Sequence, residues 1–411
     1  MKFFLALAAI FAAGAPAQTN PPALQFTPFG QGLPTSGQWR EGFRIADLNG
    51  DGHPDLVHGP PRKQSSFPVI FLGDGKGSFT RWKEARFPEL DYDYGDVEVA
   101  DFNSDGHADI AVAIHFGAIV ILTGDGHGNF TADPKFELRS PAGFSSRAIR
   151  ATRWNGNPPP GLAAVWEGPR PGTAARGVNG LLLFQHGDGG WTKAERTLSP
   201  GIYSDSLAIG DFDGDGHPDV ASGSSVMGRK DLVNLWSADG GRAAAPIPIP
   251  GGFHYVQSVA AGDFDNDGKD DLAVGYLTLE NEVWYSVIDI FFSRAGGKWE
   301  RKELSREATR SVAASMATGH LLNKGTRDLV AVTTAGQTIV FAGDGHGKFV
   351  RHNEIPVYGG GCRGSHVELA DLDGDGFDEI ITSFADEPNG TGPGAVCPTG
   401  GGFAAWKAIP R

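Results

Sequence analysis

Five copies of a nine-residue acidic sequence carry the side chains best suited to chemistry in this chain. Each copy has carboxylate or amide oxygens at positions 1, 3, 5 and 9 and a glycine at position 6. Oxygens at this spacing around a sharp turn are typical of Ca²⁺ sites, in which position 7 adds its backbone carbonyl. The predicted ligands are Asp47, Asn49, Asp51, His53 and Asp55; Asp101, Asn103, Asp105, His107 and Asp109; Asp211, Asp213, Asp215, His217 and Asp219; Asp263, Asp265, Asp267, Lys269 and Asp271; and Asp371, Asp373, Asp375, Phe377 and Glu379.

The residues around these loops indicate strands rather than helices. An EF-hand loop opens in the same way but closes with Glu at position 12 between two helices. Here the closing acid comes at position 9, and apolar runs such as 56–57 and 110–112 follow. The alternative is a set of polar turns without metal. Because position 7 contributes only its backbone carbonyl, we expect the imidazoles of His53, His107 and His217 to be exposed.

Two degenerate copies complete a regular repeat. They span residues 153–161 and 320–328, so the loops start at 47, 101, 153, 211, 263, 320 and 371. The copy at 320–328 has Lys324 at position 5 and retains Asp328, which predicts an ion pair between these two side chains in place of calcium. The copy at 153–161 has no carboxylate, and its three prolines at 158–160 predict a stiffened turn.

A glycine-rich turn that ends in an aromatic residue follows most loops, as in 73–79, 124–130 and 343–349, with a looser copy at 400–403. Each unit therefore predicts four antiparallel strands joined by an acidic loop, a variable loop and a glycine turn. Seven such units predict an all-β, seven-bladed β-propeller that occupies residues 18–411 as one domain. Either residues 24–28 or residues 403–409 could supply its last outer strand.

The acidic loops and their period resemble the FG-GAP/VCBS repeat family, which includes the head of integrin α subunits. The resemblance implies a propeller with calcium ligands at positions 1, 3, 5 and 9, and hence about five Ca²⁺ ions. The units that start at 153 and 320 depart from the family pattern.

Residues 1–17 have one positive charge, an apolar stretch and an Ala-x-Ala site, which predicts a secretory signal peptide. In an oxidising compartment, Cys362 and Cys397 are expected to form a disulfide. The expected location is therefore periplasmic or extracellular. The formal charge is −14, which five Ca²⁺ ions would reduce to about −4. Without a basic cluster or a second apolar segment, we expect no nucleic acid partner and no membrane insertion, and we expect a monomer.

The face opposite the acidic loops is the candidate ligand face, because binding residues concentrate on loops carried by a rigid scaffold. The residues selected there are Arg147, Tyr203, His254, Tyr255, Arg310 and Arg363. A second pattern lies three residues before each loop, where four successive units carry Glu368, Arg44, Glu98 and Arg150. Alternating charges on adjacent innermost strands predict an arc of ion pairs near the axis.

The sequence contains no catalytic motif. We therefore expect a secreted, calcium-stabilised binding module for a protein or a glycan. One alternative is a carbohydrate-active enzyme of the lyase or dehydratase type, which would need convergent acid and base groups; His254, Tyr255 and His366 are among the available groups, and their spacing does not define a set. Another alternative is an adhesion component of a cell surface.

Overall fold

The structure is a computed structural model. It describes residues 24–40, 42–61, 65–90, 93–136, 146–154, 156, 158–167, 180–187, 190–196, 204–223, 231–237, 243–249, 253–386 and 397–410. The predicted signal peptide, residues 1–17, lies outside this part of the chain.

The described strands form seven four-stranded antiparallel sheets, as the repeats predicted. We number these blades by the repeat units. Blade 1 contains β2 (Phe43–Ala46), β3 (Asp55–His58), β4 (Val69–Gly73) and β5 (Phe79–Arg81). Blade 2 contains β6 (Val97–Ala100), β7 (Asp109–Ala113), β8 (Ile119–Gly124) and β9 (Phe130–Ala132). Blade 3 contains β10 (Ser146–Thr152), β11 (Gly161–Trp166), β12 (Leu181–Gly187) and β13 (Gly190–Arg196).

The remaining blades repeat this order. Blade 4 contains β14 (Leu207–Gly210), β15 (Asp219–Gly223), β16 (Asp231–Ser237) and β17 (Ala243–Pro248). Blade 5 contains β18 (Phe253–Gly262), β19 (Asp271–Glu280), β20 (Val283–Arg294) and β21 (Lys298–Glu307). Blade 6 contains β22 (Ala313–Gly319), β23 (Asp328–Thr333), β24 (Thr338–Gly343) and β25 (Phe349–His352). Blade 7 contains β26 (Arg363–Ala370), β27 (Glu379–Ala385), β28 (Gly401–Pro410) and β1 (Leu24–Phe29).

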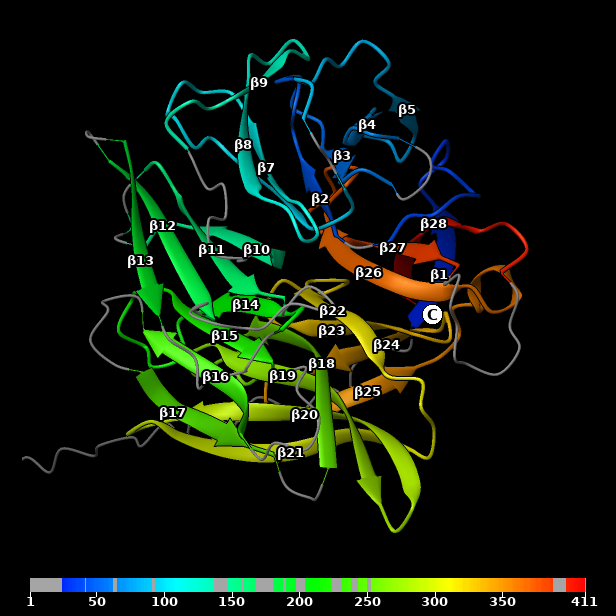
Figure 1. Cartoon of the computed structure of the whole chain (residues 1–411). Helices are drawn as coiled ribbons and strands as arrows, with labels where there is room; N and C mark the ends of the chain where they lie inside the picture. The colour runs from blue at the N-terminus through cyan, green and yellow to red at the C-terminus, as the bar shows by residue number, and fades with distance from the viewer. Residues whose placement is uncertain are drawn as a thin grey trace, which may run out of the picture.

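The first strand of each repeat lies innermost, and these strands close a ring. In chain order β2, β6, β10, β14, β18, β22 and β26 each contact the next, and β26 contacts β2. Figure 1 shows the sheets arranged around this common axis. The ring arrangement defines the fold as a β-propeller.

The hydrophobic core lies between neighbouring blades. Ala111 of blade 2, for example, packs in one cluster with Ile149 and Leu162 of blade 3, while Ile110 packs in another with Val57 of blade 1. All five residues of β7 are buried. A strand covered on both faces needs apolar side chains on both, which explains why each acidic loop precedes a continuous apolar run.

Blade 7 is closed by the two ends of the described chain. β1 pairs with β28, with Leu24 opposite Pro410 and Thr27 opposite Lys407, so residues 24–28 supply the outer strand. Residues 403–409 belong to the third strand instead. The predicted glycine turn at 400–403 is therefore wrong: Gly401 and Gly402 begin β28 opposite Ala385 and Phe384.

The predicted disulfide between Cys362 and Cys397 is confirmed. Cys362 directly precedes β26, as expected, but Cys397 precedes the third strand instead of ending it. The bond therefore joins the entrances of two strands of the closing blade.

In blade 5 the connection between the second and third strands is short. β19 and β20 extend to a two-residue turn at Asn281 and Glu282, both with positive φ. Such a turn matches the twist of two long strands, so this connection is a hairpin and not an irregular loop. Within the described residues, the sole helix is the 3₁₀ turn Tyr358–Gly360 (η1), and none is long and apolar enough to cross a membrane.

Candidate functional site

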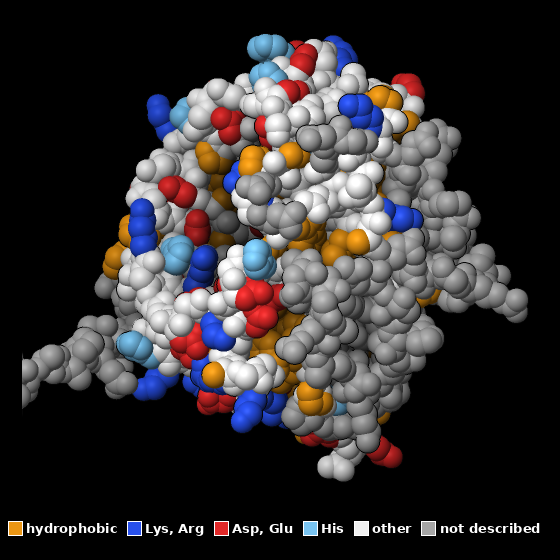
Figure 2. Space-filling model, turned by 90° about the vertical axis from the view of Figure 1, so that its left-hand side faces the viewer, with side chains coloured by type: hydrophobic (Ala, Val, Ile, Leu, Met, Phe, Trp, Pro, Cys, Tyr) orange, Lys and Arg blue, Asp and Glu red, His pale blue; other side chains and the backbone are white. Residues whose placement is uncertain are grey.

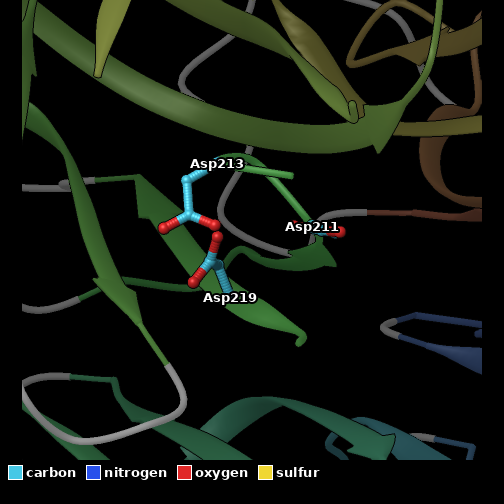
Figure 3. Close-up of side chains that lie close together, drawn as sticks. All are labelled: Asp211, Asp213 and Asp219. Atoms are coloured by element: carbon cyan, nitrogen blue, oxygen red, sulfur yellow. The ribbon is translucent and has the colours of Figure 1, made fainter. Parts of the chain in front are cut away.

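The acidic loops connect the innermost strand of a blade to its second strand, and in three blades their carboxylates converge. Single oxygens from Asp211, Asp213 and Asp219 lie within 4.8 Å of one another, as do oxygens from the sets at 263, 265, 271 and at 371, 373, 379. Figure 3 shows Asp213 and Asp219 turned toward one another, with Asp211 nearby. Because Ca²⁺–oxygen distances are about 2.3–2.6 Å, oxygens at this separation fit around one Ca²⁺ ion.

The loops at 47 and 101 have the same backbone turn with Asn at position 3. Asp47 Oδ2 accepts the Gly52 N–H at 2.8 Å, and Asp51 Oδ1 accepts the His53 N–H at 2.9 Å. Asp101 and Asp105 make the equivalent bonds. The imidazoles of His53, His107 and His217 are exposed, which confirms that prediction.

In blades 1, 2 and 5 the carboxylate at position 9 joins the loop to the third strand of its blade. Asp109 Oδ2 accepts the Phe102 N–H at 2.8 Å, and its Oδ1 accepts the Gly124 N–H at 2.9 Å from the third strand. Asp55 and Asp271 repeat both bonds. Burial raises the pKa of Asp109 to about 6 and that of Asp271 to about 7. Position 9 is therefore a structural clamp as well as a predicted metal ligand.

Blade 6 retains this clamp although its loop has lost the other ligands. Asp328 accepts the N–H groups of Leu321 and Gly343, both at 2.9 Å. The predicted ion pair between Lys324 and Asp328 is wrong, because the ammonium group of Lys324 lies over the Phe377 ring of blade 7, 5.7 Å from its centroid. Each oxygen of Asp328 instead accepts one backbone N–H.

Neighbouring loops hold the blade 6 loop in place. Asp378 of blade 7 accepts the His320 N–H at 2.7 Å through its side chain and donates its own N–H to the His320 carbonyl at 2.9 Å. On the other side, the Asn266 amide of blade 5 donates to the Gly325 carbonyl at 2.9 Å. These contacts join the blade 6 loop to the loops of blades 5 and 7.

Blade 3 replaces the clamp with an indole. Trp154 occupies position 2 and donates its Nε1–H to the Phe184 carbonyl of the third strand at 3.2 Å. A Cβ atom at Gly161, which occupies position 9, would lie 2.4 Å from that indole nitrogen. Glycine at position 9 and tryptophan at position 2 are the sequence signals for this replacement of the carboxylate by an indole. The prediction of a stiffened turn rested on the prolines at 158–160 instead.

The loops of blades 5 and 7 each receive a basic side chain of the chain itself. Arg294 donates to Asp265 Oδ2 at 2.7 Å and leaves Asp265 Oδ1 buried without a hydrogen-bond partner. In blade 7 the Lys407 ammonium contacts Asp373, Asp375 Oδ2 at 2.9 Å and Glu379 Oε1 at 3.0 Å. Asp265 Oδ1 of blade 5 and Glu379 Oε1 of blade 7 are both buried without a hydrogen bond, but the Lys407 ammonium group lies 3.0 Å from Glu379 Oε1.

A pocket lies on the axis at the opposite face. Its lining comes from all seven blades, at the beginning of the innermost strands; the acidic loops follow the ends of these strands. The residues are Arg40, Gly42, Asp96, Arg147, Ala148, Arg150, Asp205, Ser206, Gln257, Ser258, Val259, Ala314, Ser315, Met316, Arg363, Gly364, Ser365, His366 and Ala385. Charged side chains line the part formed by blades 7, 1, 2, 3 and 4, whereas blades 5 and 6 line it with uncharged ones.

Of the six predicted ligand-face residues, some line the axial pocket and others do not. Arg147 and Arg363 line the axial pocket, where Arg147 pairs with Asp205 at 3.4 Å. His254 is fully buried and packs edge-on against Tyr276, so its place on a ligand face is a wrong prediction. Tyr255 is half-buried and Arg310 is exposed, and neither lines the pocket. Tyr203 lies outside the described residues.

The predicted arc of ion pairs is confirmed. Arg44 contacts Glu368 at 2.7 Å and Glu98 at 3.2 Å, so it joins blades 7, 1 and 2. Arg150 continues the arc through Asp96, at 2.7 Å, rather than through Glu98. We had not selected Asp96 because it lies two residues before the repeating position.

On the side of the molecule shown in Figure 2, described acidic and basic side chains are interspersed rather than segregated.

Comparisons with known proteins agree with this architecture. The FG-GAP-like repeat family matches residues 63–112, 173–222 and 321–382, and the FG-GAP repeat family matches residues 255–278. Integrin alpha-PS2 of Drosophila melanogaster is 35% identical over 155 residues, which cover 35% of this chain. The match spans only 10% of that relative's length.

The chain therefore contains FG-GAP repeats and is similar, over part of its length, to an integrin α subunit. Among solved structures, one described as the Dos1 propeller matches with a TM-score of 0.49 and 13% identity, over 89% of this chain and 82% of that one. The likeness is too distant to carry information on function. The disulfide and the integrin-like repeats are consistent with an extracellular location.

Proposed function

We propose that this chain is a secreted binding module whose calcium-loaded loops stiffen one face of the propeller while the other face binds a protein ligand. The observation that carries the proposal is the axial pocket, to which all seven blades contribute. A pocket built at the centre of a rigid ring presents fixed polar groups without the entropic cost of ordering loops. The similarity to an integrin α subunit favours a protein over a glycan as the ligand.

Calcium would be held by the loops that start at 47, 101, 211 and 263, through the side chains at positions 1, 3, 5 and 9. Bound Ca²⁺ would supply positive charge to carboxylates that otherwise repel one another. The loop that starts at 371 differs, because the Lys407 ammonium group already contacts three of its carboxylates. The ligand face itself contains no predicted metal ligand, so the metal supports binding through the scaffold.

Binding of the purified chain to arrays of extracellular proteins and of glycans, with and without EDTA, tests the proposal. We expect protein hits that weaken at least tenfold in Arg147→Glu and Arg363→Glu, since both residues line the pocket. The control variants are Lys76→Glu and Lys348→Glu, which reverse exposed charges on the calcium face. Hits restricted to glycans, or binding lost only in the control variants, would contradict the proposal.

A further inference from the structure

The Lys407 side chain makes the seventh acidic loop unlike the others. Its ammonium group contacts the carboxylates at positions 3, 5 and 9 of that loop, namely Asp373, Asp375 and Glu379. The side chain is 23% exposed, and Glu379 is fully buried. These are three of the side chains that the sequence assigned to a metal ion, and one lysine contacts all three.

The position of Lys407 in the sheet explains why only this blade has such a contact among those whose register is described. In blade 7, Ile380 is the residue after position 9 of the loop, and it pairs with Trp406 on the third strand. Lys407 is the residue that follows Trp406. The same register place holds Leu72 in blade 1, Thr123 in blade 2, Gln185 in blade 3, Ser237 in blade 4, Phe292 in blade 5 and Ala342 in blade 6. None of these residues can bring a positive charge to its loop.

Blade 5 provides the contrast. Arg294 contacts Asp265 and Asp267 from outside the loop, at 2.7 and 3.4 Å, and it makes no ion pair with Asp271 at position 9. Asp265 Oδ1 and Glu379 Oε1 are both buried without a hydrogen bond, but only Glu379 Oε1 has an ammonium group 3.0 Å away. In blade 7 the lysine reaches position 9 itself, so an added divalent ion would have to displace the ammonium group.

We infer that Lys407 is the resident cation of the seventh loop, so that this loop is held without calcium while the loops of blades 1, 2, 4 and 5 bind it. The inference rests on the calcium binding proposed for those four loops. Lys407 lies on the strand that pairs with β1, with Thr27 opposite it. The blade that closes the ring therefore keeps a cation in its acidic loop when calcium is scarce.

A reciprocal exchange tests the inference. Calcium bound per chain is measured by equilibrium dialysis with metal analysis, on the full chain and on the variants Lys407→Ser and Ser237→Lys. We expect four equivalents for the wild type, five for Lys407→Ser and three for Ser237→Lys. Ser237 is the matched site because its loop carries aspartates at positions 3, 5 and 9.

A second measurement covers the case in which a variant folds poorly. Thermal unfolding in EDTA should show a larger loss for Lys407→Ser than unfolding in Ca²⁺, since Ca²⁺ would take the vacated place. Five equivalents in the wild type, with none gained in Lys407→Ser, would overturn the inference and leave the proposed calcium binding intact. Binding of no calcium at all would overturn both.

Discussion

Arg44 of the first blade donates a hydrogen bond to Glu368 of the last blade at 2.7 Å. The same guanidinium contacts Glu98 of blade 2 at 3.2 Å and Asp96 at 3.3 Å, and its side chain is only 9% exposed. One arginine therefore contacts three carboxylates where the ring closes.

Replacement of this arginine should destabilise the whole propeller. In Arg44→Met the buried acids lose their partner, and we expect a loss of about 3–5 kcal/mol in the free energy of unfolding, measured by urea denaturation. The matched control is Arg306→Met, whose exposed pair with Glu280 should cost at most about 1 kcal/mol. Equal losses in the two variants would contradict the interpretation.

The arc should also make stability depend on acid. Burial alone would raise the pKa of Glu368, but Arg44 and His366 lower it to about 2. A carboxylate whose pKa is depressed by folding stabilises the protein above its unfolded pKa, and that stabilisation is lost as the pH falls toward 2. Burial raises the pKa of Glu98, so this carboxyl group acts in the opposite direction.

We therefore expect Glu368→Gln to flatten the loss of stability between about pH 4.5 and pH 2, relative to the wild type. Unfolding free energies across this range provide the measurement, on protein that has been freed of metal with EDTA at neutral pH and dialysed into metal-free buffer, because this treatment removes any contribution from bound metal. An unchanged pH profile would show that Glu368 is not the titrating group.

The disulfide closes a segment of 35 residues in blade 7. Replacement of both cysteines by serine should lower the free energy of unfolding by about 3–4 kcal/mol, the loop-closure entropy of a segment of this size. Urea denaturation of the double variant, compared with wild type under reducing and oxidising conditions, measures the effect. Reduced wild type should match the variant; a difference between them would mean that the serines perturb packing.

The position 9 clamp can be separated from metal binding. Asp328→Asn in blade 6 leaves one of two buried N–H groups without an acceptor, so we expect a loss of about 1–3 kcal/mol that is the same in Ca²⁺ and in EDTA. Asp109→Asn is the matched variant in blade 2, where the same two bonds exist. Its loss should be larger in Ca²⁺ than in EDTA. A calcium-dependent effect in Asp328→Asn would indicate metal in blade 6.

Much of the fold was predictable because its signals are local. Positions 1 to 9 of each loop lie on a single turn, and the apolar runs that follow are buried between blades whatever their neighbours are. The charged arc was predictable for the same reason, because Arg44 and Glu98 occupy equivalent places in adjacent repeats. Because the units repeat, residues at equivalent places in adjacent repeats lie next to one another around the ring.

Contacts between register places far apart in the chain were not predictable. Lys407 and Asp373 are in contact only because β28 is the third strand of blade 7. The glycines at 400–402 indicated instead a turn that precedes the fourth strand of this blade. His254 was predicted on the surface because it precedes an expected short strand, yet β18 begins at Phe253 and buries it. Side-chain direction depends on the true strand limits, which composition does not show.

The pairing of β1 with β28 places a constraint on biosynthesis. Thr27 and Lys407 lie 380 residues apart and share a hydrogen bond. β1 is translated before the other strands of the ring, whereas its partner β28 is translated after them. The ring cannot close until β28 has been made, so β1 has no partner strand during that interval, when an unpaired edge strand is most exposed to intermolecular strand pairing.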